Sequence, residues 1–204
     1  NDLPSLEDDA KDGDINLFRQ GIENADLLNT VSPTYSKEIL TAEFGEGLEK
    51  FLQKRQNELF GILNGIDEER FNSRTDKDIY CQYDINSIDK KLENKICLQK
   101  ELGLVVDKKI PLMGIISRLT EQKGGDLINE LFDQLVKLDC QIVVLGIGDP
   151  KHENYYKNAA QKYPKNISAN IKFDVKLAQK IYASSDMFLM PSRFEPCGLG
   201  QMIA

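Results

Sequence analysis

The 204-residue chain has no tryptophan, a single histidine and only four cysteines. The cysteines, at positions 81, 97, 140 and 197, form no C-x-x-C pair, and His152 alone cannot complete a Cys/His zinc set. We therefore expect no metal site. Reduced thiols are typical of a cytosolic protein.

Long apolar runs and a surplus of positive charge are also missing. No run approaches the roughly 18 apolar residues of a membrane span, so we expect neither a membrane span nor a signal peptide. The net charge is −7, with 15 Lys and Arg against 23 Asp and Glu in residues 1–110 and 11 against 10 in residues 111–204. An acidic chain without a basic stripe argues against nucleic acid as a partner. The chain ends inside an incipient helix, so we expect a piece of a longer protein.

Hydrophobic residues nevertheless make up 41% of the chain, which is enough for a packed core. In residues 111–204, apolar runs alternate with helical spacings. Strands are expected at 111–117, 141–145, 167–173 and 187–190, and helices at 126–138, 151–163 and 175–183. The strict alternation of strands and helices predicts right-handed βαβ units, and hence a Rossmann-like, doubly wound parallel sheet.

The first half of the chain is less regular. Short helices are expected at 14–22, 34–40 and 46–53, and short strands at 26–31 and 59–63. These pieces suit the end of a different α/β domain. Residues 66–83 are polar and rich in turn residues, and 86–102 have helical spacing, with Ile88, Leu92 and Ile96 on one face. We predict a domain end at 1–67, a linker and helix at 68–108, and a partial second domain at 109–204.

Chemistry-bearing residues follow each predicted strand of the second half. Ligands of open parallel sheets bind beyond the carboxyl ends of the strands. A turn of free backbone N–H groups at a helix start binds anions, and a carboxylate beside it suits sugar hydroxyls. Together the loops supply the inventory for a nucleotide diphosphate sugar: Arg118 and Lys123, Gly146 and Gly148, Phe173, Glu195, and the helix start from Cys197 to Gly200.

Each part alone has a plainer explanation. Arg118 and Lys123 are equally well explained as surface cations, and the two glycines by a tight turn. Phe173 is more typical of a core residue, and Cys197 of a small packing residue. We expect His152 to be exposed at the start of a polar helix. Only Glu195, between Phe and Pro, has no evident structural role, which favours a functional role for its carboxylate.

Five ordered segments carry a family resemblance. They are NTVSPTYSKEI (29–39), GILNGID (61–67), SRLTEQKGG (117–125), LGIGDP (145–150) and MFLMPSRFEPCGLGQM (187–202). The chain closely resembles bacterial glycogen synthase and plant starch synthase, most weakly at 68–105. The resemblance implies a GT-B fold, in which two Rossmann-like domains face each other across a cleft. It also implies retaining transfer of glucose from ADP-glucose to the non-reducing 4-OH of an α-1,4-glucan, with no cofactor.

The resemblance also implies roles by position. Arg118 and Lys123 match the family's cations on the leaving diphosphate, and Glu195 matches its carboxylate at the donor glucose. Asn64 matches an asparagine that reaches the donor from the first domain, and Phe173 an aromatic residue near the adenine. The remaining nucleotide-binding positions are Gly146, Gly148, Cys197, Gly198, Leu199 and Gly200. The location implied is the cytoplasm, or a plastid for a plant or alga.

Departures from the family pattern limit what the chain does alone. The K-x-G-G-L donor loop and the catalytic-centre histidine are absent, and Gly200 stands where many members have threonine. The motif supplies one carboxylate, whereas a retaining glycosidase uses two about 5 Å apart, so we predict no covalent glucosyl-enzyme. We expect these 204 residues alone not to turn over. Two alternatives stay open: a related GT-B transferase that uses UDP-glucose, and a non-catalytic glucan- or nucleotide-binding module.

Overall fold

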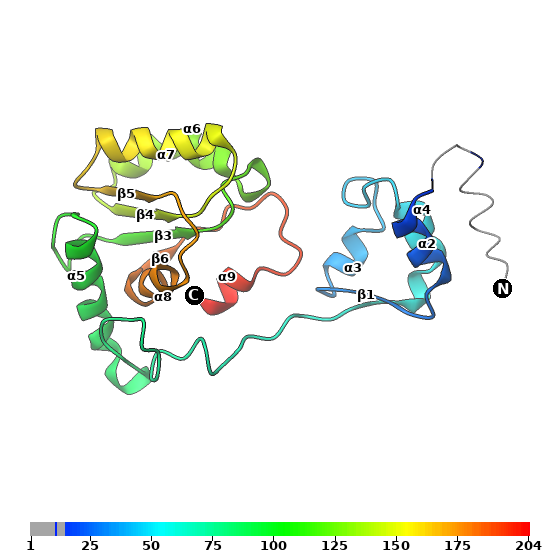
Figure 1. Cartoon of the computed structure of the whole chain (residues 1–204), viewed down its shortest axis with the longest axis horizontal. Coiled ribbons are helices and arrows are strands. Elements are labelled where there is room, and N and C mark those ends of the chain that lie inside the picture. Colours follow the sequence, from blue (N-terminus) through cyan, green and yellow to red (C-terminus); the bar gives the residue numbers. More distant parts are fainter. Residues whose placement is uncertain (1–10, 12–14) are drawn as a thin grey trace. The chain divides into compact units, whose positions relative to one another are not determined.

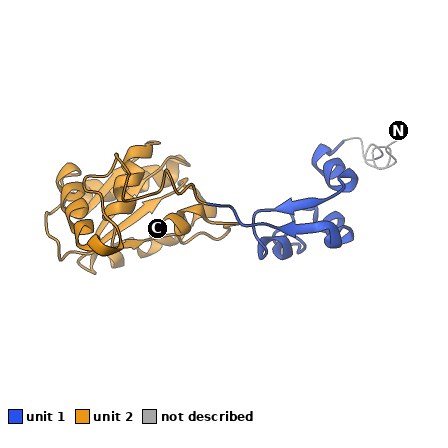
Figure 2. Ribbon diagram, turned by 90° about the horizontal axis from the view of Figure 1, so that it is seen from below, with its two compact units in different colours: residues 1–65 blue, residues 66–204 orange. Residues whose placement is uncertain are grey.

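The computed structural model describes residue 11 and residues 15–204 of the chain. These form two compact units, one within residues 1–65 and the other of residues 66–204, which Figure 2 distinguishes by colour. The predicted domain limits at 67 and 108 stay predictions.

The first unit is a small parallel sheet with short helices. Strands β1 (Leu28–Thr30) and β2 (Leu59–Gly61) pair in parallel. The helices are α2 (Leu17–Asn24), α3 (Tyr35–Glu38), α4 (Glu49–Lys54) and the 3-10 turn η1 (Gln56–Glu58). Each expected element has a counterpart, most of them shorter than predicted; of the predicted helix at 14–22, Asp14 lies outside the described residues. Ile22, Ile39 and Leu52 form the core of this unit.

The second unit carries a four-stranded parallel sheet in the order β5-β4-β3-β6. The strands are β3 (Leu112–Ile116), β4 (Gln141–Leu145), β5 (Ile167–Asn170) and β6 (Met187–Phe188). The chain passes from β3 to β4 and β5 on one side and then returns to pair β6 with the other edge of β3. The order therefore reverses between β3 and β6, and such a switch point opens a ligand crevice at the carboxyl ends of the strands.

Helices cover both faces of this sheet. The helical segments of the second unit are η2 (Ile85–Lys90), α5 (Lys91–Glu101), η3 (Glu121–Lys123), α6 (Gly125–Val136), α7 (Pro150–Lys162), α8 (Val175–Ser184) and α9 (Leu199–Ile203). Figure 1 shows α6 and α7 along one side of the strands and α5 and α8 along the other. The predicted doubly wound arrangement is present.

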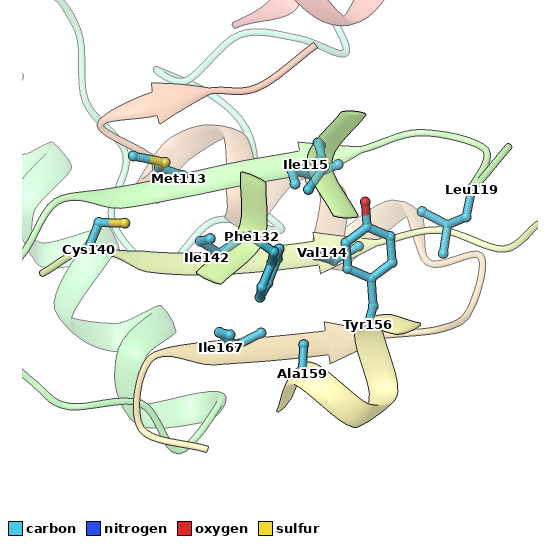
Figure 3. Close-up of a cluster of buried hydrophobic side chains, with 11 residues drawn as sticks. Met113, Ile115, Leu119, Phe132, Cys140, Ile142, Val144, Tyr156, Ala159 and Ile167 are labelled. Atoms are coloured by element: carbon cyan, nitrogen blue, oxygen red, sulfur yellow. The ribbon is translucent and has the colours of Figure 1, made fainter. Parts of the chain in front are cut away.

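Alternation along the strands divides the core into two layers. Met113, Ile115, Ile142 and Val144 pack against α6 and α7, through Phe132 and Tyr156 among others (Figure 3). The alternate positions of each strand face the other side of the sheet, where they pack against α5 and α8. There Leu112, Val143 and Leu145 contact Leu98, Leu177 and Ile181. Both faces of β3 and β4 are buried, which explains their nearly continuous apolar sequences.

Helix α5 buries a polar face, which hydrophobic spacing did not predict. Ile88 and Leu92 are exposed, with Ile88 in η2 beyond a kink at Ser87. The buried side chains include Lys95, whose Nζ lies 2.6 Å from Asp186 Oδ2. Gln99 and Asn94 are also fully buried. Each has hydrogen-bond partners, so the cost of burying polar groups is offset.

Candidate functional site

The loops that follow β3 and β6 meet at the switch point, in backbone contact. Gly124 has φ +74°, and a Cβ there would lie 2.2 Å from the carbonyl oxygen of Pro191. A side chain is excluded both by the left-handed backbone and by the close approach. Gly124 therefore lets the two loops dock.

Lys123 and Glu195 form the centre of this contact. Lys123 ends the 3-10 turn η3, and its Nζ lies 2.6 Å from Glu195 Oε2, while Ser192 Oγ donates to the same oxygen at 2.9 Å. The side chains of Lys123 and Glu195 are 17% and 22% exposed. A partly buried, charge-assisted pair of this kind is held more firmly than a surface ion pair. The structure thus brings together two of the three predicted catalytic residues.

Arg118 joins them through Gln122. Its Nη2 donates to Gln122 Oε1 at 3.0 Å, and Gln122 Nε2 donates to the carbonyl of Phe194 at 3.3 Å. The backbone N–H of Arg193 in turn donates to the Gln122 carbonyl at 3.0 Å. The exposed guanidinium of Arg118 is therefore tied to the loop that carries Glu195.

A second ion pair braces the same two loops. Arg193 Nη2 bonds to Asp126 Oδ2 in the first turn of α6. The Arg193 guanidinium lowers the pKa of the Asp126 carboxyl. Sequence reasoning did not find Gln122, Ser192 or Asp126 as site residues. Gln122 is four positions from Arg118 and Ser192 is three positions from Glu195, so these two pairs are local in the chain. Asp126 lies 67 positions from Arg193, so no local signal points to it.

A cavity of about 350 Å³ opens beside Arg118 at the carboxyl ends of the strands. Gly146 and Phe173 line it, together with Arg70 and Phe71 from the chain that precedes α5. Phe173 is 83% exposed, so its interpretation as a core residue is wrong. An aromatic face with two guanidinium groups and an apolar floor suits a planar ring that carries an anion.

Asp174 fixes the start of α8 at the edge of this cavity. Its Oδ1 accepts from Leu177 N at 2.9 Å, and its Oδ2 lies 2.7 Å from Lys172 Nζ. The backbone N–H of Leu177, and then Lys172, lower the pKa of the Asp174 carboxyl. The Lys172 charge is thereby balanced, which leaves Arg70 and Arg118 to give the cavity its positive character.

Gly146 and Gly148 are needed for the approach of the β3 and β4 loops. A Cβ would lie 1.9 Å from Ser117 O at Gly146 and 2.3 Å from Leu119 O at Gly148. The N–H of Gly148 donates to Glu153 Oε1 at 3.0 Å. Close packing therefore accounts for both glycines, and their predicted contact with the nucleotide stays a prediction.

The predicted helix start exists as α9, a helix of five residues. Gly198, with φ +82°, is its N-cap, and Gln201 Nε2 donates to the carbonyl of Cys197 at 3.2 Å. A Cβ at Gly200 would lie 3.3 Å from the ring of Phe188, and glycine avoids this tight contact. The nucleotide-binding roles of Cys197, Gly198, Leu199 and Gly200 stay predictions.

Two further expectations concern residues outside this cluster. Asn64 is exposed in the first unit, and its role at the donor stays a prediction. The expectation of an exposed His152 is wrong, since the side chain is 2% exposed. A Cβ on Gly125 would lie 2.7 Å from His152 Nδ1, so the imidazole packs on the glycine that opens α6. Because the sequence of α7 is mostly polar, it did not indicate that His152 lies on the buried face of the helix.

Residue 11 and residues 15–204 contain no group of three or more His, Cys, Asp or Glu side chains placed to hold a metal ion. None of the helices in this same part of the chain combines the length and the hydrophobicity that a transmembrane segment requires.

The chain is similar to known proteins along most of its length. Residues 2–54 match the family described as starch synthase catalytic domain, and residues 100–201 match glycosyl transferases group 1. It is 56% identical to a glycogen synthase of Thermosipho melanesiensis over 93% of this chain and 40% of that protein. It is 57% identical to one of Pseudothermotoga lettingae, over 93% of this chain and 39% of that protein.

A solved structure shares the fold. The catalytic domain of starch synthase IV from Arabidopsis thaliana, bound to ADP and acarbose, superposes with a TM-score of 0.87 at 38% identity. The match covers 93% of this chain and 39% of that one. The chain thus spans about 40% of the length of the curated relatives it matches.

Proposed function

Because this chain belongs to the glycogen and starch synthase family of glycosyltransferases, we propose that its whole protein transfers glucose from ADP-glucose to the end of an α-1,4-glucan. The predicted family and the α/β, GT-B-type fold class are confirmed by the comparisons. Glucose would pass to the non-reducing 4-OH with retention at the anomeric carbon, in the cytoplasm or a plastid.

One observation carries the proposal: the loop of the partly buried Lys123–Glu195 pair is connected through Gln122 to Arg118, which lines the cavity. Breaking the bond between glucose and phosphate builds negative charge on the departing ADP and positive charge on the sugar. Cations fixed before the reaction stabilise that state more than the ground state. Arg118 and Lys123 would hold the diphosphate, Arg118 through paired N–H donors and Lys123 as a point charge.

Glu195 would act on the sugar side. Its contacts with Lys123 and Ser192 both use Oε2, and they orient the carboxylate within the loop. A carboxylate held in this way can accept hydrogen bonds from sugar hydroxyls and offset the charge of an oxocarbenium-like transition state. Phe173 would stack on the adenine, and Asn64 would contribute from the first unit.

The test uses the full-length protein with a glycogen primer and either ADP-glucose or UDP-glucose. We expect transfer from ADP-glucose, and a loss of about 100- to 1,000-fold in turnover for Arg118→Ala, Lys123→Ala and Glu195→Gln. Lys137→Ala, which removes an exposed lysine after α6, is the matched control and should leave turnover unchanged.

The alternatives give different results in the same assay. Faster transfer from UDP-glucose would assign the chain to a related transferase, and glucan binding without transfer would assign it to a non-catalytic module. If all three site variants kept near-wild-type rates, the site assignment would be wrong.

A further inference from the structure

We propose that Gln122 is a positioning residue, which aims the Arg118 guanidinium at the diphosphate of the donor. This inference rests on the proposed function and adds to it a residue that does not itself touch the leaving group. It is carried by three hydrogen bonds of Gln122: one to Arg118 within the loop after β3, and two that connect this loop with the loop after β6.

The amide of Gln122 is oriented by the opposite loop. Its Nε2 donates to the backbone carbonyl of Phe194 at 3.3 Å, so the other end of the amide must be the acceptor. That acceptor, Oε1, lies 3.0 Å from Arg118 Nη2. The Gln122 carbonyl also accepts from Arg193 N at 3.0 Å, which anchors the residue at its backbone. A fixed carbonyl oxygen is thus presented to a long and exposed side chain.

Arg118 needs such a support. Exposed arginine side chains populate many rotamers, and a cation acts on a developing charge only when it is already in place. Within the part of the chain that the structure describes, Gln122 is the side chain that the guanidinium bonds to. The bond uses one Nη2–H and leaves the other N–H groups of the planar fork available for a diphosphate.

A neutral acceptor suits this task better than a charged one. A carboxylate at position 122 would also accept from Arg118, but it would balance the positive charge that a diphosphate requires. It would further place an oxygen against the Phe194 carbonyl, where the amide now donates. The glutamine amide accepts from Arg118 through Oε1 and donates to Phe194 through Nε2, and it does not change the net charge of the site.

The experiment measures ADP and adenosine binding to the full-length protein by titration calorimetry. The variants are Gln122→Met, which keeps the length of the side chain and removes its hydrogen bonds, Arg118→Ala and the double variant. Gln134→Met makes the same change on the exposed face of α6 and is the matched control.

We expect Gln122→Met to weaken ADP binding about tenfold, the scale of one hydrogen bond to a charged group. The double variant should bind ADP within about twofold of Arg118→Ala alone, because Gln122 acts through the arginine. Adenosine, which lacks the diphosphate, should bind Gln122→Met as well as it binds wild type. Gln134→Met should match wild type for both ligands.

Three results would overturn the proposal: unchanged ADP binding in Gln122→Met, losses that multiply in the double variant, or an equal loss of adenosine binding, which would indicate a collapsed loop. The binding cycle also separates this proposal from the proposed function. If wild type binds ADP with the expected coupling but transfers no glucose, the proposed function fails and the role of Gln122 stands. If glucose transfer is observed without this coupling, the role of Gln122 fails and the proposed function stands.

Discussion

Gly124→Ala should disable the site by forcing apart the two loops that build it. A Cβ at this position would lie 2.2 Å from Pro191 O, whereas real contacts are essentially never under 3.0 Å, so the loops must separate by at least the difference, 0.8 Å. Lys123 precedes this glycine, and its 2.6 Å bond to Glu195 spans the same gap. A misplacement of about 1 Å in a catalytic group costs on the order of 100-fold in rate.

The stability cost has two parts. The left-handed backbone, with φ +74°, costs about 1–2 kcal/mol for a residue with a Cβ. Overpacking against Pro191 adds about 1–3 kcal/mol. Gly103 isolates the first part, since it has φ +70° and a Cβ there would meet nothing within 4 Å.

Both variants are therefore compared by urea unfolding and by glucose transfer in the full-length protein. Gly103→Ala should lose about 1–2 kcal/mol and keep its turnover. Gly124→Ala should lose more stability and about 100-fold in kcat/KM. Turnover in Gly124→Ala within twofold of Gly103→Ala would refute the idea that contact between these loops sets the catalytic geometry.

Three other substitutions test separate parts of the structure. Phe173→Ala should weaken ADP binding about tenfold or more in calorimetry, because stacking is lost, with little change in Tm because the ring is 83% exposed. Lys95→Met should lower the free energy of unfolding by about 2–3 kcal/mol and leave ADP affinity unchanged. The loss is smaller than for a fully buried ion pair because Asp186 is partly exposed. Asp126→Asn removes a carboxyl whose pKa Arg193 lowers from 3.8, so its stabilisation is present above that pH and is lost as pH falls. The stability gap between wild type and Asp126→Asn, followed by urea unfolding, should therefore shrink below pH 3.8; a gap that widened on acidification would contradict the ion pair.

The sheet was predictable because its physical signal is local. Strands β3 and β4 are nearly continuous apolar runs, since both faces are covered, and β4 has the predicted bounds of 141–145. The predicted fourth strand was too long. Only Met187 and Phe188 pair with β3, and Pro191 lacks the N–H that a longer ladder would use.

The sequence indicated candidate site residues but not the contacts between them. The rule that ligands bind beyond strand ends selected Arg118, Lys123 and Glu195. It did not predict that Lys123 and Glu195, 72 positions apart, bond directly, because that depends on β6 pairing beside β3. Gln122 looked like an ordinary polar residue, since the groups that orient it, Phe194 and Arg193, lie on another loop. The buried polar face of α5 was missed for the same reason: each polar group is paired by a distant segment.

The most direct test of the central claim is a crystal structure of the full-length protein with ADP. The account predicts a diphosphate within hydrogen-bond distance of Arg118 and Lys123, with the adenine against Phe173. A nucleotide bound elsewhere, with the 118–123 and 191–195 loops empty, would contradict it.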